Sequence, residues 1–262
     1  MLTTGYMDES YDGAQQDLFS MSCLVAKGTT WLEVERLWKL HLAAKNRELK
    51  KTGRPLISRY HAADCSGRRN EFDGWNHDER DKFVIGLFGV IKRMRGGMHT
   101  VGYDISLDDL CAVFPEWAND RLGSGYDFLT KFVLWTLGQD HKENAPSAQV
   151  KITLFHDRTP KHDVTILNAF NNYMADPNFD HRHYFTTIAP LGWEDCIALQ
   201  PADLVAFEVF KAAQAHRAAR KNRKSFTALL DFKSFGIHTR SFDRKTLEEM
   251  REHIEKVKAG AA

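Results

Sequence analysis

Three aspartates that lie far apart in the sequence have surroundings typical of metal-binding carboxylates. Asp8 and Asp157 each come where an apolar, strand-like segment gives way to polar residues, and Asp203 lies in the first turn of an expected helix with apolar neighbours. Ligands in α/β folds gather beyond the ends of strands. A carboxylate among apolar residues is costly unless it is paired or binds a metal. We therefore predict that these three side chains converge as metal ligands.

Converging carboxylates point to the hydrolysis of phosphodiesters with divalent metal ions. Such sites hold two ions about 3.5–4 Å apart, one activating water and the other stabilising the leaving oxygen, and Asp8 would bridge them. Hard oxygen ligands favour Mg²⁺ or Mn²⁺ over zinc. Taken one at a time, the three aspartates also have a structural interpretation, because Asp commonly caps loops and stabilises helix N-termini.

Three further polar residues could complete such a site. Glu9 alternates with Asp8 and faces the opposite side of an ideal strand, so it joins the site only if the chain bends there. His61 lies in a polar segment and could relay protons, because its ordinary pKa is near neutral. Gln200 could hydrogen-bond a substrate. The alternatives are a structural role for Glu9, a surface or core role for His61, and helix capping for Gln200.

Basic residues that could contact phosphates are concentrated in three places. The formal net charge of +1 excludes a polyanion-binding scaffold of the histone type, so nucleic-acid contacts must come from local patches. The patches are Arg68 with Arg69, then Lys92, Arg93 and Arg95, and finally the basic residues of 211–224. The last patch could follow a nucleic-acid backbone without reading its sequence. It could equally be a solvated helix end favoured by the helix dipole.

The elements that must position these residues are strands alternating with helices. Apolar alternation predicts an antiparallel hairpin at the start of the chain, with acidic residues in its enlarged loop, and an irregular segment at 58–70. The predicted strands are 4–7, 17–26, 99–105, 150–155 and 184–189, with a strand-like piece at 235–239. The predicted helices are 30–51, 77–93, a short helix capped by Ser106, 126–138, 160–174, one beginning at Gln200, and 243–258.

This alternation predicts one α/β domain over residues 1–262, with helices on a mixed sheet. Its core spans about residues 4–215, and a C-terminal helical extension covers about 224–262. The last helix carries an apolar stripe that could cover the domain or bind a second copy or a partner protein.

The cysteines and the N-terminus bear on the cellular compartment. The four cysteines are scattered and form no C-x-x-C pair, so neither a zinc site nor a disulfide framework is indicated. The N-terminus lacks a basic region followed by an apolar stretch, and no apolar run approaches the roughly 20 residues that cross a bilayer. We expect a cytoplasmic protein outside the membrane.

Four motifs occur in an order that resembles a known family. They are Tyr6-Met7-Asp8-Glu9-Ser10, His61-Ala62-Ala63-Asp64, Leu154-Phe155-His156-Asp157-Arg158 and Leu199-Gln200-Pro201-Ala202-Asp203-Leu204. Over roughly residues 4–215 the chain resembles the bacterial and phage family catalogued as domain of unknown function 3800. The resemblance implies a ribonuclease H-like fold with helical insertions. It also implies a metal-dependent nuclease site at Asp8, Glu9, Asp157 and Asp203. Arg158 stands where many members have a second acid, and it could supply a phosphate contact instead.

The leading hypothesis is therefore a nuclease that hydrolyses DNA or RNA with Mg²⁺ or Mn²⁺. Its catalytic set is Asp8, Glu9, His61, Asp157 and Asp203, and its substrate contacts are Arg68, Arg69, Arg158 and Gln200. One alternative is an inactive nucleic-acid-binding or defence-complex protein with the same fold. Another is a hydrolase for a phosphorylated small molecule, for which the sequence offers no Gly-rich phosphate loop.

Overall fold

The chain forms a six-stranded mixed sheet in the order β5-β4-β1-β2-β3-β6. The computed structural model describes residues 2–13, 17–94, 97–144, 150–194, 196–230 and 237–260. The strands are β1 (Leu2–Tyr11), β2 (Leu18–Lys27), β3 (Met98–Ser106), β4 (Lys151–Asp157), β5 (Phe185–Leu191) and β6 (Ile237–Phe242). Strand β2 runs antiparallel to β1 and β3, whereas β1–β4, β4–β5 and β3–β6 are parallel pairs. The predicted α/β class with a mixed sheet is thus confirmed.

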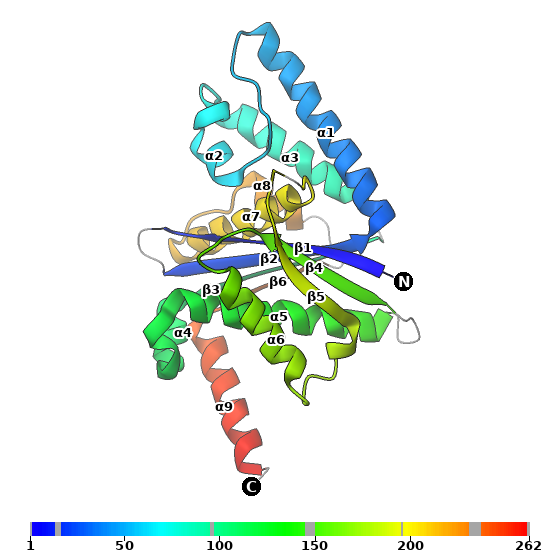
Figure 1. Cartoon of the computed structure of the whole chain (residues 1–262). Coiled ribbons are helices and arrows are strands. Elements are labelled where there is room, and N and C mark those ends of the chain that lie inside the picture. Colours follow the sequence, from blue (N-terminus) through cyan, green and yellow to red (C-terminus); the bar gives the residue numbers. More distant parts are fainter. Residues whose placement is uncertain are drawn as a thin grey trace.

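Helices cover both faces of this sheet (Figure 1). One face carries α7 (Leu199–Arg217), with α1 (Gly28–Lys51), α2 (Ala62–Gly67), α3 (His77–Arg93) and α8 (Lys224–Leu230) around it and beyond it. The other face carries α4 (Leu107–Val113), α5 (Arg121–Asn144) and α6 (Asp163–Ala175). Short 3-10 helices span Asn70–Phe72, Pro115–Asp120 and Arg182–Tyr184. Central strand β2 is buried along nearly its whole length because both of its faces are covered.

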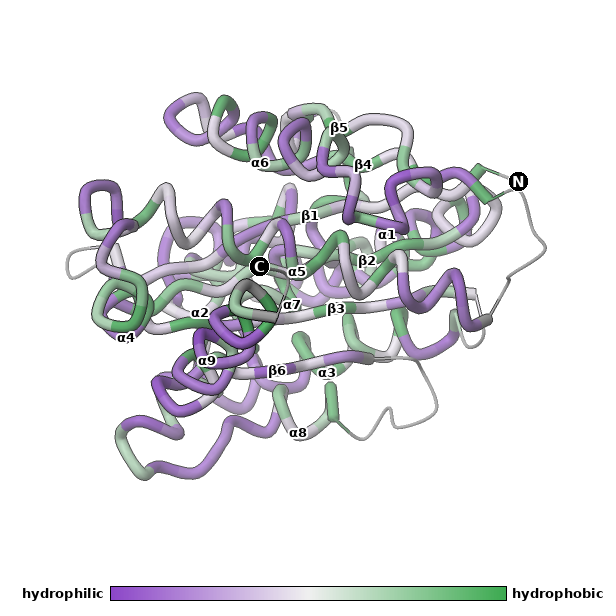
Figure 2. The backbone as a smooth tube through the Cα atoms, turned by 90° about the horizontal axis from the view of Figure 1, so that it is seen from below, coloured by the Kyte–Doolittle hydropathy of each residue, from purple (hydrophilic) through white to green (hydrophobic). Residues whose placement is uncertain are grey.

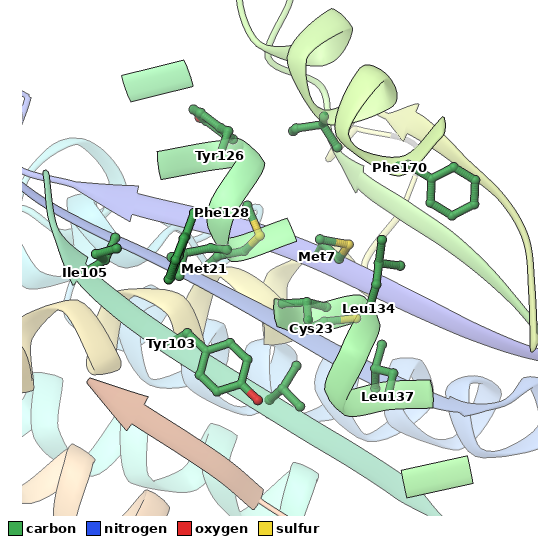
Figure 3. Close-up of a cluster of buried hydrophobic side chains, with 14 of the residues drawn as sticks. Met7, Met21, Cys23, Tyr103, Ile105, Tyr126, Phe128, Leu134, Leu137 and Phe170 are labelled. Atoms are coloured by element: carbon green, nitrogen blue, oxygen red, sulfur yellow. The ribbon is translucent and has the colours of Figure 1, made fainter. Parts of the chain in front are cut away.

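Two apolar cores lie on the two sides of the sheet. On the α7 side, Trp38, Leu87 and Phe88 are fully buried. On the α5 side, Met7 and Met21 from the strands pack with Leu134 of α5 (Figure 3). The C-terminal helix α9 (Arg244–Gly260) projects away from the sheet, and most of it is hydrophilic (Figures 1 and 2).

Three local predictions were wrong. Strand β1 continues to Tyr11, so Asp8 and Glu9 lie within a strand and not in a loop, because Ser10 and Tyr11 still pair with β2. The segment predicted to be irregular contains helix α2. Helix α5 begins well before the predicted residue 126 and ends after 138. The strand-like piece at 235–239 lies partly outside the described residues, and β6 begins at Ile237.

Among the helices of the described chain, none has both the length and the apolar character that crossing a membrane requires.

Gly5 occupies a position in β1 where a side chain has no room. A Cβ built there lies 2.5 Å from Leu154 Cδ2 and 2.9 Å from Val25 Cγ2. Both neighbours are buried, so we expect Gly5→Ala to lower the free energy of unfolding by about 1–3 kcal/mol through overpacking. Urea unfolding measures the change. Gly28→Ala, at a position with nothing within 4 Å, is the control, and equal midpoints for the two variants would contradict the prediction.

Candidate functional site

The register of two parallel strands places Asp8 beside Asp157. Strands β1 and β4 pair up to Met7 and His156, and the two aspartates are the next residue on each strand. Neighbouring strands lie about 4.8 Å apart, so the two backbones are adjacent there. Tyr6 packs edge-on against Trp31 of α1, with ring centroids 4.7 Å apart. Because side chains alternate along a strand, Asp8 faces the same side of the sheet as Tyr6.

Helix α7 brings Asp203 to this face. The helix is held on β2 by two buried serines, with Ser22 Oγ donating to the Ala202 carbonyl at 2.8 Å and Ser20 Oγ to the Ala206 carbonyl at 2.9 Å. These small polar residues let the helix backbone approach the strand closely. The Asp203 carboxylate then accepts a hydrogen bond from the backbone N–H of Ala62, at 2.8 Å, which ties the start of α2 to α7.

Glu9 takes the opposite side of β1, as strand alternation requires. Its Oε1 accepts hydrogen bonds from Tyr126 Oη of α5 at 2.7 Å and from Thr159 Oγ1 at 3.2 Å. The backbone N–H of Glu9 also donates to Asp8 Oδ1 at 2.7 Å. Glu9 nevertheless lines the same cavity as Asp8.

The four carboxylates share one cavity near the carboxyl ends of β1 and β4. It has a volume of about 250 Å³ and is lined by Asp8, Glu9, Arg59, Tyr60, His61, Asp157, Trp193, Leu199, Gln200 and Asp203. We call it the carboxylate cavity. Among the described residues, no three His, Cys, Asp or Glu side chains are arranged as a ready-made metal cluster. The acids therefore share the cavity without already standing at ligand positions.

The carboxylate cavity concentrates negative charge in a partly buried place. Burial, followed by the nearby carboxylates with Asp203 foremost, raises the pKa of Asp8 well above its ordinary value. Burial raises the pKa of Glu9 to about 7, although the hydrogen bond from Tyr126 opposes the shift. Burial also raises the pKa of Asp203 to about 6 and raises that of Asp157. These raised pKa values mean that the surrounding groups compensate only part of the free-energy cost of burying the negative charges.

Two groups that can carry positive charge face these acids. His61 Nδ1 lies 2.9 Å from Asp64 Oδ2, which fixes the ring orientation. The Arg59 guanidinium carbon lies 3.4 Å from the ring centroid of Trp193. Burial raises the pKa values of Asp157 and Asp203, and positive charge on Arg59 and His61 lowers them in part. Arg59 and Trp193 were missed by the sequence reasoning, because neither belongs to a motif and they come from distant segments.

Gln200 has a structural role inside the carboxylate cavity. Its Oε1 accepts hydrogen bonds from Trp38 Nε1 and from the backbone N–H of Tyr60, both at 2.9 Å. Gln200 is buried, and these bonds join α7 to α1 and to the segment before α2. The amide therefore positions the wall that carries Arg59 and His61.

The three predicted phosphate-binding arginines lie outside the lining of the cavity. Arg68, Arg69 and Arg158 are all exposed. Arg69 lies 3.6 Å from Asp64, the partner of His61. The backbone N–H of Arg158 donates to Asp157 Oδ1 at 3.0 Å. These side chains could meet only the parts of a substrate that extend beyond the cavity.

Arg68 has a left-handed backbone at the end of α2, with φ 53° and ψ 52°. This region costs a residue with a side chain about 1–2 kcal/mol, and glycine adopts it freely. We expect Arg68→Gly to raise the free energy of unfolding by up to about 1 kcal/mol, measured by urea unfolding. Arg69 is extended, with φ −117°, so Arg69→Gly should destabilise the protein instead. A loss of stability in both variants would refute the prediction.

In comparisons with known proteins, no family model matches the chain and no curated protein matches its sequence.

Proposed function

We propose that this protein is a nuclease that hydrolyses DNA or RNA phosphodiesters with the help of divalent metal ions. The observation that carries the proposal is the gathering of Asp8, Glu9, Asp157 and Asp203 in one cavity. They come from two parallel strands and a helix on the sheet. Carboxylates that converge from separate elements are the arrangement on which metal-dependent phosphodiester hydrolysis depends.

A ribonuclease H-like fold is part of the same proposal. The resemblance of the four motifs implies that fold, in which helices flank a mixed sheet. The six-stranded sheet with helices on both faces supports it. The Asp-Glu-Ser motif at Asp8 lies on β1, the strand that pairs with both β2 and β4.

The chemistry of the carboxylate cavity suits Mg²⁺ or Mn²⁺. Asp8, Asp157 and Asp203 would hold the ions, because hard carboxylate oxygens are the ligands these ions prefer. Burial, with neighbouring carboxylates as a smaller cause, raises the pKa values of Asp8 and Asp203, and a bound cation would compensate their buried negative charge. When bound, the ions would activate water and stabilise the leaving oxygen.

The remaining side chains have distinct parts in this proposal. Arg59 places a permanent positive charge beside the carboxylates, where it can bind a phosphate oxygen. Asp64 Oδ2 occupies Nδ1 of His61 at 2.9 Å, so Nε2 is the ring nitrogen left to exchange a proton with a substrate or water. Tyr126 and Thr159 hold Glu9 in a single orientation.

The size of the carboxylate cavity favours a polymer over a small molecule. Its volume of about 250 Å³ is below the roughly 300–1,000 Å³ of pockets that enclose small ligands. A phosphate and part of a nucleotide fit inside, and the rest of the substrate must lie outside.

A cleavage assay tests the proposed function. The full-length protein is incubated with labelled single- and double-stranded DNA and RNA, in Mn²⁺, in Mg²⁺ and in EDTA. We expect cleavage of at least one substrate with a divalent ion and none in EDTA. A thermal-shift titration with Mn²⁺ accompanies it, because an ion that binds the folded state raises Tm. Binding of nucleic acid with neither cleavage nor stabilisation by Mn²⁺ would instead support the inactive binding protein.

A further inference from the structure

Trp193 is a large aromatic side chain left partly open at the carboxylate cavity. It lies just beyond β5, whose last residue Leu191 pairs with Asp157. It lines the cavity and is 38% exposed. Trp135 is also exposed, at 47%, but lines a different cavity, and Trp31, Trp38 and Trp75 are buried. Leaving an indole in water forgoes burial energy. A ligand that covers the ring would recover that energy.

Arg59 determines what kind of ligand suits this ring. The Arg59 guanidinium carbon lies over the indole, 3.4 Å from the ring centroid, in a cation–π contact. The same guanidinium lies close enough to the cavity for its charge to act on Asp157 and Asp203. A negative group that binds Arg59 in this cavity would therefore lie beside the indole. Phosphate next to an aromatic surface is the pattern of a nucleotide, which carries its base one sugar away from its phosphate.

The carboxylate cavity is not a favourable place for that base. Four carboxylates line it, and its volume of about 250 Å³ is below the roughly 300–1,000 Å³ of pockets that enclose whole small ligands. With a phosphate and ions inside, the base would lie at the rim, where Trp193 is exposed. Inside a duplex both faces of each base are covered by neighbouring base pairs, so away from the duplex ends a protein aromatic stacks on a base that is unpaired.

We propose that Trp193 is a stacking platform for one unpaired nucleobase, which makes single-stranded nucleic acid the substrate class of this site. The inference rests on the proposed function, because it names the substrate of the same cavity. Arg59 binds the phosphate, and Trp193 accepts the adjoining base on the part of the ring that Arg59 leaves open. Trp193 is thus a specificity determinant that contacts the base.

Binding measurements in EDTA test this without any cleavage. The probes are a fluorescein-labelled single strand, the same strand as a duplex, and a strand in which every base is replaced by an abasic spacer. We expect Trp193→Ala to weaken single-strand binding by about 5- to 150-fold, the factor for losing one base–aromatic stack. Trp193→Phe should stay within about threefold of wild type, because a phenyl ring still stacks. Trp135→Ala is the matched control, since Trp135 is 47% exposed and lines a different cavity.

Arg59→Ala separates the stacking role from a supporting role. If Trp193 only held Arg59 in place, both alanine variants would weaken single strand, duplex and abasic strand alike, and that result would overturn the inference. We expect Arg59→Ala to weaken the binding of all three probes and Trp193→Ala to weaken the binding of only the base-containing single strand.

The wild-type protein provides a test that does not depend on the folding of Trp193→Ala. It should bind the abasic strand more weakly than the normal strand. Equal binding of those two strands by wild type would also overturn the inference. Absence of cleavage with Mn²⁺ would reject the nuclease function, whereas base-dependent binding would still uphold the stacking platform.

Discussion

Asp8→Asn is expected to lower metal-dependent phosphodiester cleavage by about 10³-fold or more, equivalent to about 4 kcal/mol of transition-state stabilisation. Asp8 shares the carboxylate cavity with the other three acids, and after burial their charges are what raises its pKa. Asparagine has nearly the same shape and keeps an oxygen that can accept the Glu9 N–H. It removes the negative charge that a divalent ion requires. Initial rates of cleavage in Mn²⁺, at saturating substrate, measure the loss.

Asp104→Asn is the matched control for this substitution. Asp104 is also a strand carboxylate, and burial raises its pKa to about 6. It accepts a hydrogen bond from Ser241 Oγ at 2.7 Å and does not line the carboxylate cavity. Asp104→Asn should therefore cleave at close to the wild-type rate. Cleavage by Asp8→Asn at the wild-type rate would show that the activity belongs to another site or another protein.

In EDTA at about pH 8, we expect Asp8→Asn to be more stable than wild type by roughly 0.5–2 kcal/mol, the usual gain from a single stabilising substitution, seen as a Tm higher by about 2–4 °C per kcal/mol. The acids of the carboxylate cavity have raised pKa values, so they oppose folding when they are ionised. Neutral asparagine removes one charge from this group and relieves the repulsion on the others. The opposite effects on activity and on stability are the signature of a carboxylate kept for function.

The pH dependence of this stability difference follows from the direction of the shifts. The ordinary pKa values are 3.8 for Asp203 and 4.5 for Glu9, and in the folded protein they rise to about 6 and about 7. Below its unfolded-state pKa, an acid whose pKa is raised by folding is protonated in both states and costs no stability. As the pH rises through the folded-state pKa, its ionisation lowers the free energy of unfolding. The gap between Asp8→Asn and wild type should thus be small near pH 4 and widen up to about pH 7.

Mn²⁺ should reverse the order of the two proteins. The ion stabilises the wild type by binding its folded state, and Asp8→Asn loses much of that gain. Thermal unfolding of both proteins across this pH range, in EDTA and in Mn²⁺, provides the measurement. A gap that stays constant with pH in EDTA would mean that burial and mutual repulsion do not raise the pKa values of the acids in the carboxylate cavity.

Local chemistry explains which elements could be predicted from the sequence. The predicted helix 77–93 matches α3, where the Asn76 side chain accepts from the backbone N–H of Glu79. Ser106 caps α4 as predicted, by accepting from the backbone N–H of Asp109. Capping and helical periodicity act within a few residues, so a short stretch of sequence contains the information.

Elements that depend on distant partners could not be predicted in the same way. The polar end of β1 was expected to be a loop, yet Ser10 and Tyr11 pair with Ser20 and Phe19 of β2. Helix α2 begins where Ala62 donates to Asp203, which lies far along the chain. In both places a long-range contact overrides a polar local sequence.

The sequence by itself determined which residue types could form a metal site, because acids at strand ends and on an apolar helix are costly without a cation or a partner. It therefore identified Asp8, Asp157 and Asp203, and the strand period determined that Glu9 faces away from Asp8. Only the tertiary structure decided that all four acids share one cavity. The register of β1 on β4 and the docking of α7 on β2 bring them together. The tertiary structure also placed Arg59 and Trp193 at this cavity. Strand pairing and helix packing depend on burial over the whole chain, so no local sequence pattern predicts them.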